Sequence, residues 1–289
     1  MPYRQRRGSR RHRAHASGGT LHYLEGIPGP QGDGTPRRVI VALPAGHGET
    51  TARWPVVYMH DGQNLFDDAT SFAGSWRLGE SLASASRLGA QAIVVGVWNG
   101  AERRLHEYGP FEDPQVGGGG AREYLDWLCD VLRPIIDARF RTVRDRLHTG
   151  IAGSSMGGLV SLYALFERPD VFGFAGVMSP SLWFARAAIF DYVERQPWVD
   201  ARIYLDIGGR EGERMVANAR RMRDLLVAKG YLPGERLRWM EDATAVHHEA
   251  AWGRRFRKAL PALLAVPGHG DGRQPWHAFG APHAQGMNG

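Results

Sequence analysis

The chain of 289 residues lacks several features that would assign it to a special class of protein. It has one cysteine, Cys129, so neither an intramolecular disulfide nor a cysteine metal cluster can form. No segment approaches the roughly 18 consecutive apolar residues that a membrane-spanning helix needs. Apolar residues themselves are not scarce, because 43% of the chain is hydrophobic. That content is enough to bury a core and excludes disorder over most of the chain.

Acidic residues are absent from residues 1–16, which hold six arginines. This segment accounts for the whole net charge of +6, so the rest of the chain is neutral overall. A twin-arginine export signal requires an apolar run after its arginine pair, and no such run follows Arg6-Arg7 or Arg10-Arg11. We therefore expect a cytoplasmic protein. We expect residues 1–18 to form a disordered arm, which either binds a polyanion weakly or is simply solvated and has no function. We expect no other nucleic-acid partner and no membrane contact.

The remainder of the chain divides into a folded domain and a tail. Residues 266–289 are rich in Gly, Pro and His without periodicity, which predicts a disordered tail. Residues 19–265 alternate short apolar runs with amphipathic segments and contain no repeat or linker, which predicts one domain. Strands are predicted near 39–43, 55–59, 92–97, 147–152, 172–178, 203–207 and 237–240, and helices near 77–87, 120–138, 156–167, 213–229 and 249–264. This alternation predicts an α/β fold whose central sheet is mostly parallel, with helices on both faces.

A candidate nucleophile lies where a predicted strand runs into a predicted helix. Residues 151–158 read Ile-Ala-Gly-Ser-Ser-Met-Gly-Gly and contain the pattern G-x-S-x-G, with Ser155 at its centre. In a nucleophile elbow, this strand–turn–helix arrangement exposes a serine on a strained turn, and the helix N-terminus offers N–H groups to an oxyanion. The structural alternative is a glycine-rich turn in which Ser154 caps the helix.

A serine hydroxyl needs a base that is oriented by an acid, and on this type of sheet the chain order is Ser, acid, His. Glu211 follows the sixth predicted strand and is the predicted acid, although it could instead stabilise the start of the next helix. Asp206, within that strand, is the alternative acid. His247 and His248 both follow the last predicted strand, and their position alone does not choose between them.

A predicted strand also runs into the loop 60–63, His-Asp-Gly-Gln. The backbone N–H of Gln63, together with that of Met156 after the nucleophile, would form an oxyanion hole. Gly62 would let the backbone approach the substrate oxygen closely. The structural alternative is an Asp-Gly turn. We predict no metal site, because no second ligand cluster accompanies the His-Asp pair of this loop.

Five segments together resemble the esterase-D-like, or “putative esterase”, family of α/β-hydrolases. They are YMHDGQNLF (58–66), RLHEYGPF (104–111), GSSMGG (153–158), YLDIGGREGE (204–213) and HHEAAW (247–252). The family includes siderophore esterases, feruloyl and acetyl esterases of carbohydrates, and mycolyltransferases. The resemblance implies the α/β-hydrolase fold. It also implies Ser155 as nucleophile, Glu211 as acid, His247 rather than His248 as base, Gln63 and Met156 as oxyanion donors, and Trp76, Arg104, Glu107 and Tyr108 near the substrate.

The predicted function is hydrolysis of a small-molecule carboxylic ester through an acyl-enzyme, without a cofactor. Three enzymatic alternatives use the same triad. They are acyl transfer to an alcohol acceptor, hydrolysis of a siderophore-type trilactone, and hydrolysis of an amide. The alternative outside enzymes is a binding module that acts through the basic arm.

Overall fold

The computed structural model describes residues 13–14, 18–30 and 35–265. The predicted tail and most of the predicted arm lie outside these residues, so their disorder stays a prediction. Within the arm, Arg13–Ala14 forms strand β1, which pairs antiparallel with β2, Thr20–Ile27.

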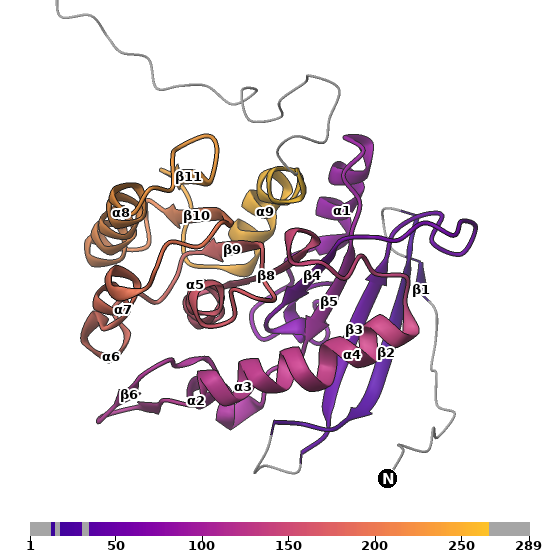
Figure 1. The fold of residues 1–289 in the computed structure, drawn as a ribbon, viewed down its shortest axis with the longest axis horizontal. Coiled ribbons are helices and arrows are strands. Elements are labelled where there is room, and N and C mark those ends of the chain that lie inside the picture. The colour runs from indigo at the N-terminus through magenta and orange to yellow at the C-terminus, as the bar shows by residue number, and fades with distance from the viewer. Residues whose placement is uncertain (1–12, 15–17, 31–34, 266–289) are drawn as a thin grey trace, which may run out of the picture.

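Nine strands of the described residues form one central sheet (Figure 1). The other seven are β3 (Arg37–Leu43), β4 (Val56–Met59), β5 (Ile93–Val97), β8 (Thr149–Ser154), β9 (Phe174–Met178), β10 (Arg202–Gly208) and β11 (Leu237–Asp242). The spatial order is β1-β2-β3-β5-β4-β8-β9-β10-β11, with parallel pairing from β5 to β11 and antiparallel pairing from β1 to β5. Strand β2 is absent from the predicted set because polar residues interrupt its apolar ones. A separate short hairpin joins β6 (Glu112–Asp113) and β7 (Gly117–Gly118).

The five predicted helical segments all occur, and short helices add to them. The α-helices are α1 (Leu78–Arg87), α2 (Arg104–Tyr108), α3 (Ala121–Trp127), α4 (Arg133–Arg139), α5 (Met156–Glu167), α6 (Phe184–Ala187), α7 (Ile189–Arg195), α8 (Glu213–Ala228) and α9 (Glu249–Leu264). The π-helical turn η3 (Leu128–Leu132) joins α3 to α4, and η1 (Gly62–Asn64), η2 (Ala101–Arg103) and η4 (Arg146–His148) are 3-10 turns. Among the residues described, no helix has both the length and the apolar character needed to cross a bilayer.

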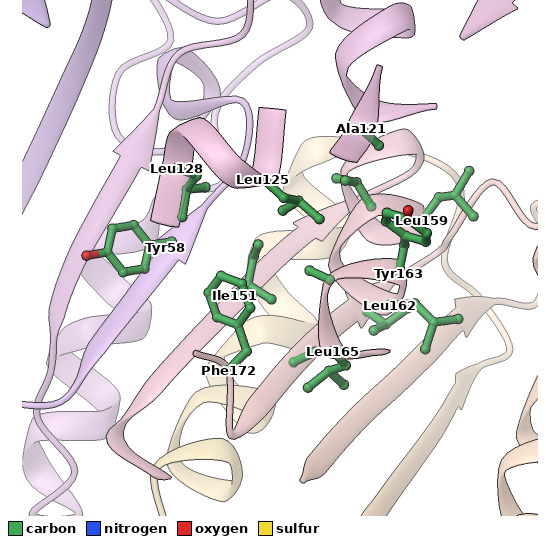
Figure 2. Packing of buried hydrophobic residues seen from close by; sticks show 14 of the residues in the cluster. Tyr58, Ala121, Leu125, Leu128, Ile151, Leu159, Leu162, Tyr163, Leu165 and Phe172 are labelled. Atoms are coloured by element: carbon green, nitrogen blue, oxygen red, sulfur yellow. The ribbon is translucent and has the colours of Figure 1, made fainter. Parts of the chain in front are cut away.

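Helices cover both faces of the sheet, with α1 and α9 on one side and α3, α4 and α5 on the other (Figure 1). Side chains alternate between the two faces, as strand geometry requires. On β4, Tyr58 enters the core beneath α3 and α5, whereas Val57 and Met59 enter the core beneath α1 and α9. Figure 2 shows Tyr58 and Ile151 on the side of the sheet that faces Leu125 and Leu128. The predicted mostly parallel sheet with helices on both faces is confirmed.

This topology gathers the predicted site loops. Strands β4, β8, β10 and β11 are parallel, so their carboxyl ends lie at one edge of the sheet. The loop 60–63, the turn at Ser155, the loop of Glu211 and the loop of His247 each follow one of these ends. Residues separated by almost 190 positions can therefore meet in one place.

Candidate active site

Ser155 occupies a strained turn between β8 and α5. Its φ of 57° and ψ of −121° are rare for a residue that carries a side chain. Its N–H donates to the carbonyl of Met178, and its own carbonyl accepts from the N–H of Ser181, both at 3.0 Å. Glycine is required at position 153, since a Cβ there would lie 2.9 Å from the backbone of Gly157. The main chain therefore fixes the serine at the turn.

The Ser155 hydroxyl contacts a second hydroxyl, that of Ser181, with 3.2 Å between the two Oγ atoms. Within the described part of the chain, no hydrogen bond joins Ser155 Oγ to His247 or His248. Ser154, the alternative capping residue, ends strand β8, and α5 has no side-chain cap. The turn thus has the geometry of a nucleophile elbow, with the hydroxyl resting against Ser181.

Glu211 and His247 meet as the chain order predicts. His247 Nδ1 lies 2.7 Å from Glu211 Oε2. Burial raises the pKa of Glu211, but hydrogen bonds from His247 and Ser179 and the positive charge of Arg255 outweigh it, so this pKa lies below its ordinary value. An ionised carboxylate only accepts hydrogen bonds, so Nδ1 carries the proton and Nε2 is free to accept one. The Glu211 side chain is fully buried, whereas that of His247 is 37% exposed.

His248 has a different role, although it is the next residue. Its Nδ1 accepts the N–H of Ala250, which makes His248 the N-cap of α9. The ring of His247 instead stands perpendicular to the indole of Trp252, with 4.8 Å between centroids. Of the two histidines, the geometry therefore favours His247 as a base.

Asp206, the alternative acid, is committed to other partners. Its Oδ1 accepts the N–H of Ser179 at 3.0 Å, and its Oδ2 lies 3.1 Å from Nε of Arg255. The carboxyl is completely buried, and burial raises the pKa of Asp206 to about 6. Glu211 is thus the carboxylate that contacts an imidazole.

The two predicted oxyanion donors are backbone N–H groups near helix starts. Met156 is the first residue of α5 and Gln63 the second of η1, so neither N–H has a partner within its helix. The two segments pack together, because a Cβ added to Gly157 would lie 3.1 Å from Cβ of His60. The segments that carry the two N–H groups are therefore neighbours, as an oxyanion hole requires.

The loop 60–63 is held by contacts that the sequence does not reveal. A Cβ at Gly62 would lie 2.5 Å from the Gly96 carbonyl group on β5, so the close approach that requires glycine is to the sheet. Asp61 adopts a left-handed φ of 53°, and its N–H donates to the hydroxyl of Tyr108. Its two carboxylate oxygens accept from Nε and a terminal nitrogen of Arg104 at 2.7 and 2.9 Å. These bonds fix the backbone beside Gln63.

Three of the four predicted substrate-binding residues are buried beneath the site. Trp76 is 4% exposed and packs against Trp252, and Tyr108 is fully buried under Asp61. Glu107 is 2% exposed and forms an ion pair with Arg37. Arg104, whose side chain is 30% exposed, is the one of the four that a substrate can readily reach. The other three are buried, so they can act on a substrate only by supporting the residues around them, and the predicted part of all four in substrate binding stays a prediction.

Three further residues of the site were not identified by the sequence analysis. Ser179 and Ser181 follow the carboxyl end of β9, beside the elbow, and that position at a strand end is the signal that could have found them. Arg255 lies inside α9 and has no such signal. Among the described residues, no three His, Cys, Asp or Glu side chains gather so that they could hold a metal ion.

The chain is similar to a known family and to several known proteins. A family model described as “Putative esterase” matches residues 32–263. An uncharacterized protein of Bacillus subtilis, YbbA, is 27% identical over 240 residues, which cover 78% of this chain and 92% of that protein. A siderophore triacetylfusarinine C esterase of Aspergillus fumigatus is 34% identical over 138 residues, which cover 45% of each protein.

Solved structures share the fold at lower sequence identity. The BES protein of Bacillus cereus has a TM-score of 0.67 and 20% identity, covering 85% of this chain and 95% of that one. The enterobactin esterase FES of Shigella flexneri has a TM-score of 0.66 and 20% identity, covering 83% of this chain and 58% of that one. At this sequence identity, the two likenesses support the fold described above.

Proposed function

The chain belongs to the “Putative esterase” family and is a carboxylic ester hydrolase, and from this premise we propose that it cleaves its substrate with a Ser155–His247–Glu211 triad. The observation that carries this proposal is the 2.7 Å contact between Glu211 Oε2 and His247 Nδ1, at the edge of the sheet where Ser155 occupies its strained turn. The predicted family, fold class and enzyme class are confirmed, whereas the roles of these residues are the proposal.

In the first step, Nε2 of His247 accepts the Ser155 proton while Oγ attacks the ester carbonyl carbon. Glu211 stabilises the resulting imidazolium through Nδ1. The hydroxyl must turn away from Ser181 to reach the imidazole. Such catalytic hydrogen bonds commonly tighten when substrate binds, so the resting contact with Ser181 is compatible with the mechanism.

The tetrahedral oxyanion would be stabilised by the N–H groups of Gln63 and Met156, and each such donor is worth about 3–4 kcal/mol. His247 then gives its proton to the leaving alcohol, which leaves an acyl group on Ser155. In the second step, a water molecule gives a proton to His247 as it attacks the acyl carbon, and His247 returns that proton to Ser155 Oγ as the bond between Oγ and the acid breaks. Every proton moves through one imidazole, and no metal or organic cofactor takes part.

A second, more specific candidate is hydrolysis of a siderophore-type ester. It is favoured by the similarity to the siderophore triacetylfusarinine C esterase of A. fumigatus and to a siderophore enterobactin esterase of Emericella nidulans, 32% identical over 77 residues. Acyl transfer to an alcohol would use the same three side chains, so it remains an outcome of the test.

The test compares wild type, Ser155→Ala and the control Ser86→Ala. The substrates are p-nitrophenyl esters of graded acyl length, a p-nitroanilide as the amide, and a trilactone siderophore. Ser86 is a half-buried serine on α1 whose hydroxyl accepts from Gln91. We expect Ser155→Ala to lower kcat/KM for esters by about 10⁵-fold or more, and Ser86→Ala to leave it within about threefold. Unchanged ester hydrolysis in Ser155→Ala would refute the proposal. Added alcohols that divert the acyl group from water would identify an acyltransferase.

A further inference from the structure

The hydroxyl of Ser179 is surrounded by three polar partners whose chemistry fixes its direction. Trp252 Nε1 lies 3.0 Å away and a terminal nitrogen of Arg255 lies 2.6 Å away. An indole and a guanidinium can only donate, so they occupy both lone pairs of Oγ. The one proton of Ser179 is therefore left for Glu211 Oε1, at 2.7 Å.

The two oxygens of Glu211 have separate sets of partners. Oε1 accepts from Ser179 and from the N–H of Gly208 at 2.9 Å, and it lies 3.5 Å from Arg255. Oε2 is the oxygen that faces His247. Since Oε1 is tied down from three directions, the plane of the carboxylate is fixed and Oε2 is aimed at Nδ1.

Arg255 joins this arrangement to the alternative acid. Its side chain is 1% exposed, and its Nε pairs with the buried carboxylate of Asp206 at 3.1 Å. One planar guanidinium thus forms an ion pair with Asp206, donates a hydrogen bond to Ser179 and lies beside Glu211, which a lysine ammonium could not do from one position. Arg255 and Trp252 are three residues apart on α9, so they share a face of the helix that begins directly after the two histidines.

We propose that Ser179 and Arg255 are positioning residues, which hold Glu211 so that its Oε2 meets His247 and which contribute to the rate without touching the substrate. This inference rests on the proposed triad, since it gives the two residues an effect only through Glu211. A purely structural role would instead change stability and leave the turnover of the folded enzyme unaffected.

The first variant is Ser179→Ala. Ser179 has a φ of 40°, and alanine carries the same Cβ, so the substitution removes the hydroxyl without changing the backbone strain. We expect kcat to fall about tenfold or more and KM to stay within about twofold, because the lost bond orients the catalytic acid and does not bind substrate.

The decisive experiment repeats Ser179→Ala in a Glu211→Gln background. If Ser179 acts through Glu211, its removal changes kcat there by less than about twofold, because coupled groups are not additive. An equal loss of kcat in both backgrounds, or no loss in the wild-type background, overturns the proposal.

Ser81→Ala is the matched control. Ser81 is equally buried, and its hydroxyl donates to the carbonyl of Gly253 on the same helix α9, so it removes a comparable bond without contacting Glu211. We expect a lower melting temperature and a kcat within about twofold of wild type. A tenfold loss of kcat in this control would mean that loosening α9 is sufficient, which also overturns the proposal.

Arg255→Lys provides a second variant that keeps the buried charge. We expect about a tenfold loss of kcat, again suppressed in the Glu211→Gln background, and this variant decides the matter if Ser179→Ala does not fold. If neither folds, the residues serve stability and the proposal is wrong. If Ser155→Ala is inactive but Ser179→Ala keeps its full kcat, only this inference is refuted. If Ser155→Ala keeps full activity, the triad itself is refuted.

Discussion

The nucleophile half and the acid half of the site are held in place by different kinds of bonds. Ser155 is fixed by its main chain, through the carbonyl of Met178, the N–H of Ser181 and a strained φ. The buried carboxylate of Glu211 is fixed mainly by side chains, with Ser179 and His247 each at 2.7 Å. The first half should therefore respond to changes in backbone geometry, and the second to changes in hydrogen bonding at constant shape.

The largest expected difference separates two neighbouring residues of the acid half. His247→Ala removes the base, so we expect kcat/KM to fall about 10⁴-fold or more, whereas His248→Ala should stay within about threefold. His248→Ala should instead lower stability by about 1 kcal/mol, because it removes the N-cap of α9. Ester hydrolysis and thermal melts on both variants measure this, and the opposite pattern would exchange the roles of the two histidines.

The next effect tests the acid itself. Glu211→Gln keeps the volume of the side chain but presents an amide to His247, so we expect kcat to fall about 10²–10⁴-fold. Asp206→Asn should mainly lower the melting temperature and change kcat little, because it removes the nearer of the two carboxylates that pair with the buried Arg255. Steady-state kinetics and melts on both variants give the comparison. A greater loss of kcat in Asp206→Asn would make Asp206 the functional acid.

A backbone change should act on the nucleophile half with an intermediate effect. Gly153→Ala would bring a Cβ to 2.9 Å from the backbone of Gly157, which must move the start of α5 and with it the Ser155 turn. We expect kcat to fall about 10–100-fold, since small displacements of reacting groups carry losses of this size. Gly48→Ala is the control, because nothing lies within 4 Å of its added Cβ. Equal activity of both variants would show that the turn tolerates displacement.

The smallest effect is the pH dependence of stability. The pKa of Glu211 lies below its ordinary value, so the unfolded chain binds the proton more tightly than the folded one. Glu211 therefore stabilises the fold above about pH 4.3, the ordinary pKa of glutamate, and this contribution is lost as pH falls through the folded-state pKa. Melting temperatures between pH 3 and pH 6 should fall more steeply with acid in wild type than in Glu211→Gln. Parallel curves would contradict the assignment.

The contrast between the halves also explains what the sequence could predict. The strand–turn–helix around Ser155 is local, and glycine spacing encodes backbone geometry, so the elbow was predictable. The order Ser, acid, His came from the rule for such sheets and stays a prediction. Ser179 and Arg255 meet Glu211 from separate segments of the chain, and no local pattern reports such a contact. The choice between His247 and His248 needed a helix boundary accurate to one residue, which periodicity does not provide.

Burial accounts for the remaining differences. Trp76, Glu107 and Tyr108 belong to segments near the site, but their side chains turn into the protein and support it. Strand β2 was not predicted because its alternation is imperfect, although it pairs with β3 over most of its length. In both cases the sequence indicated the correct neighbourhood, and tertiary packing decided the orientation.

The most direct measurement of the central claim is covalent labelling with a p-nitrophenyl phosphonate, which transfers its phosphonyl group to an activated serine. Peptide mapping by mass spectrometry should find one adduct, on Ser155. Labelling should slow strongly in His247→Ala and Glu211→Gln and proceed at the wild-type rate in His248→Ala. An adduct on another residue, or an unchanged labelling rate in His247→Ala, would contradict the account.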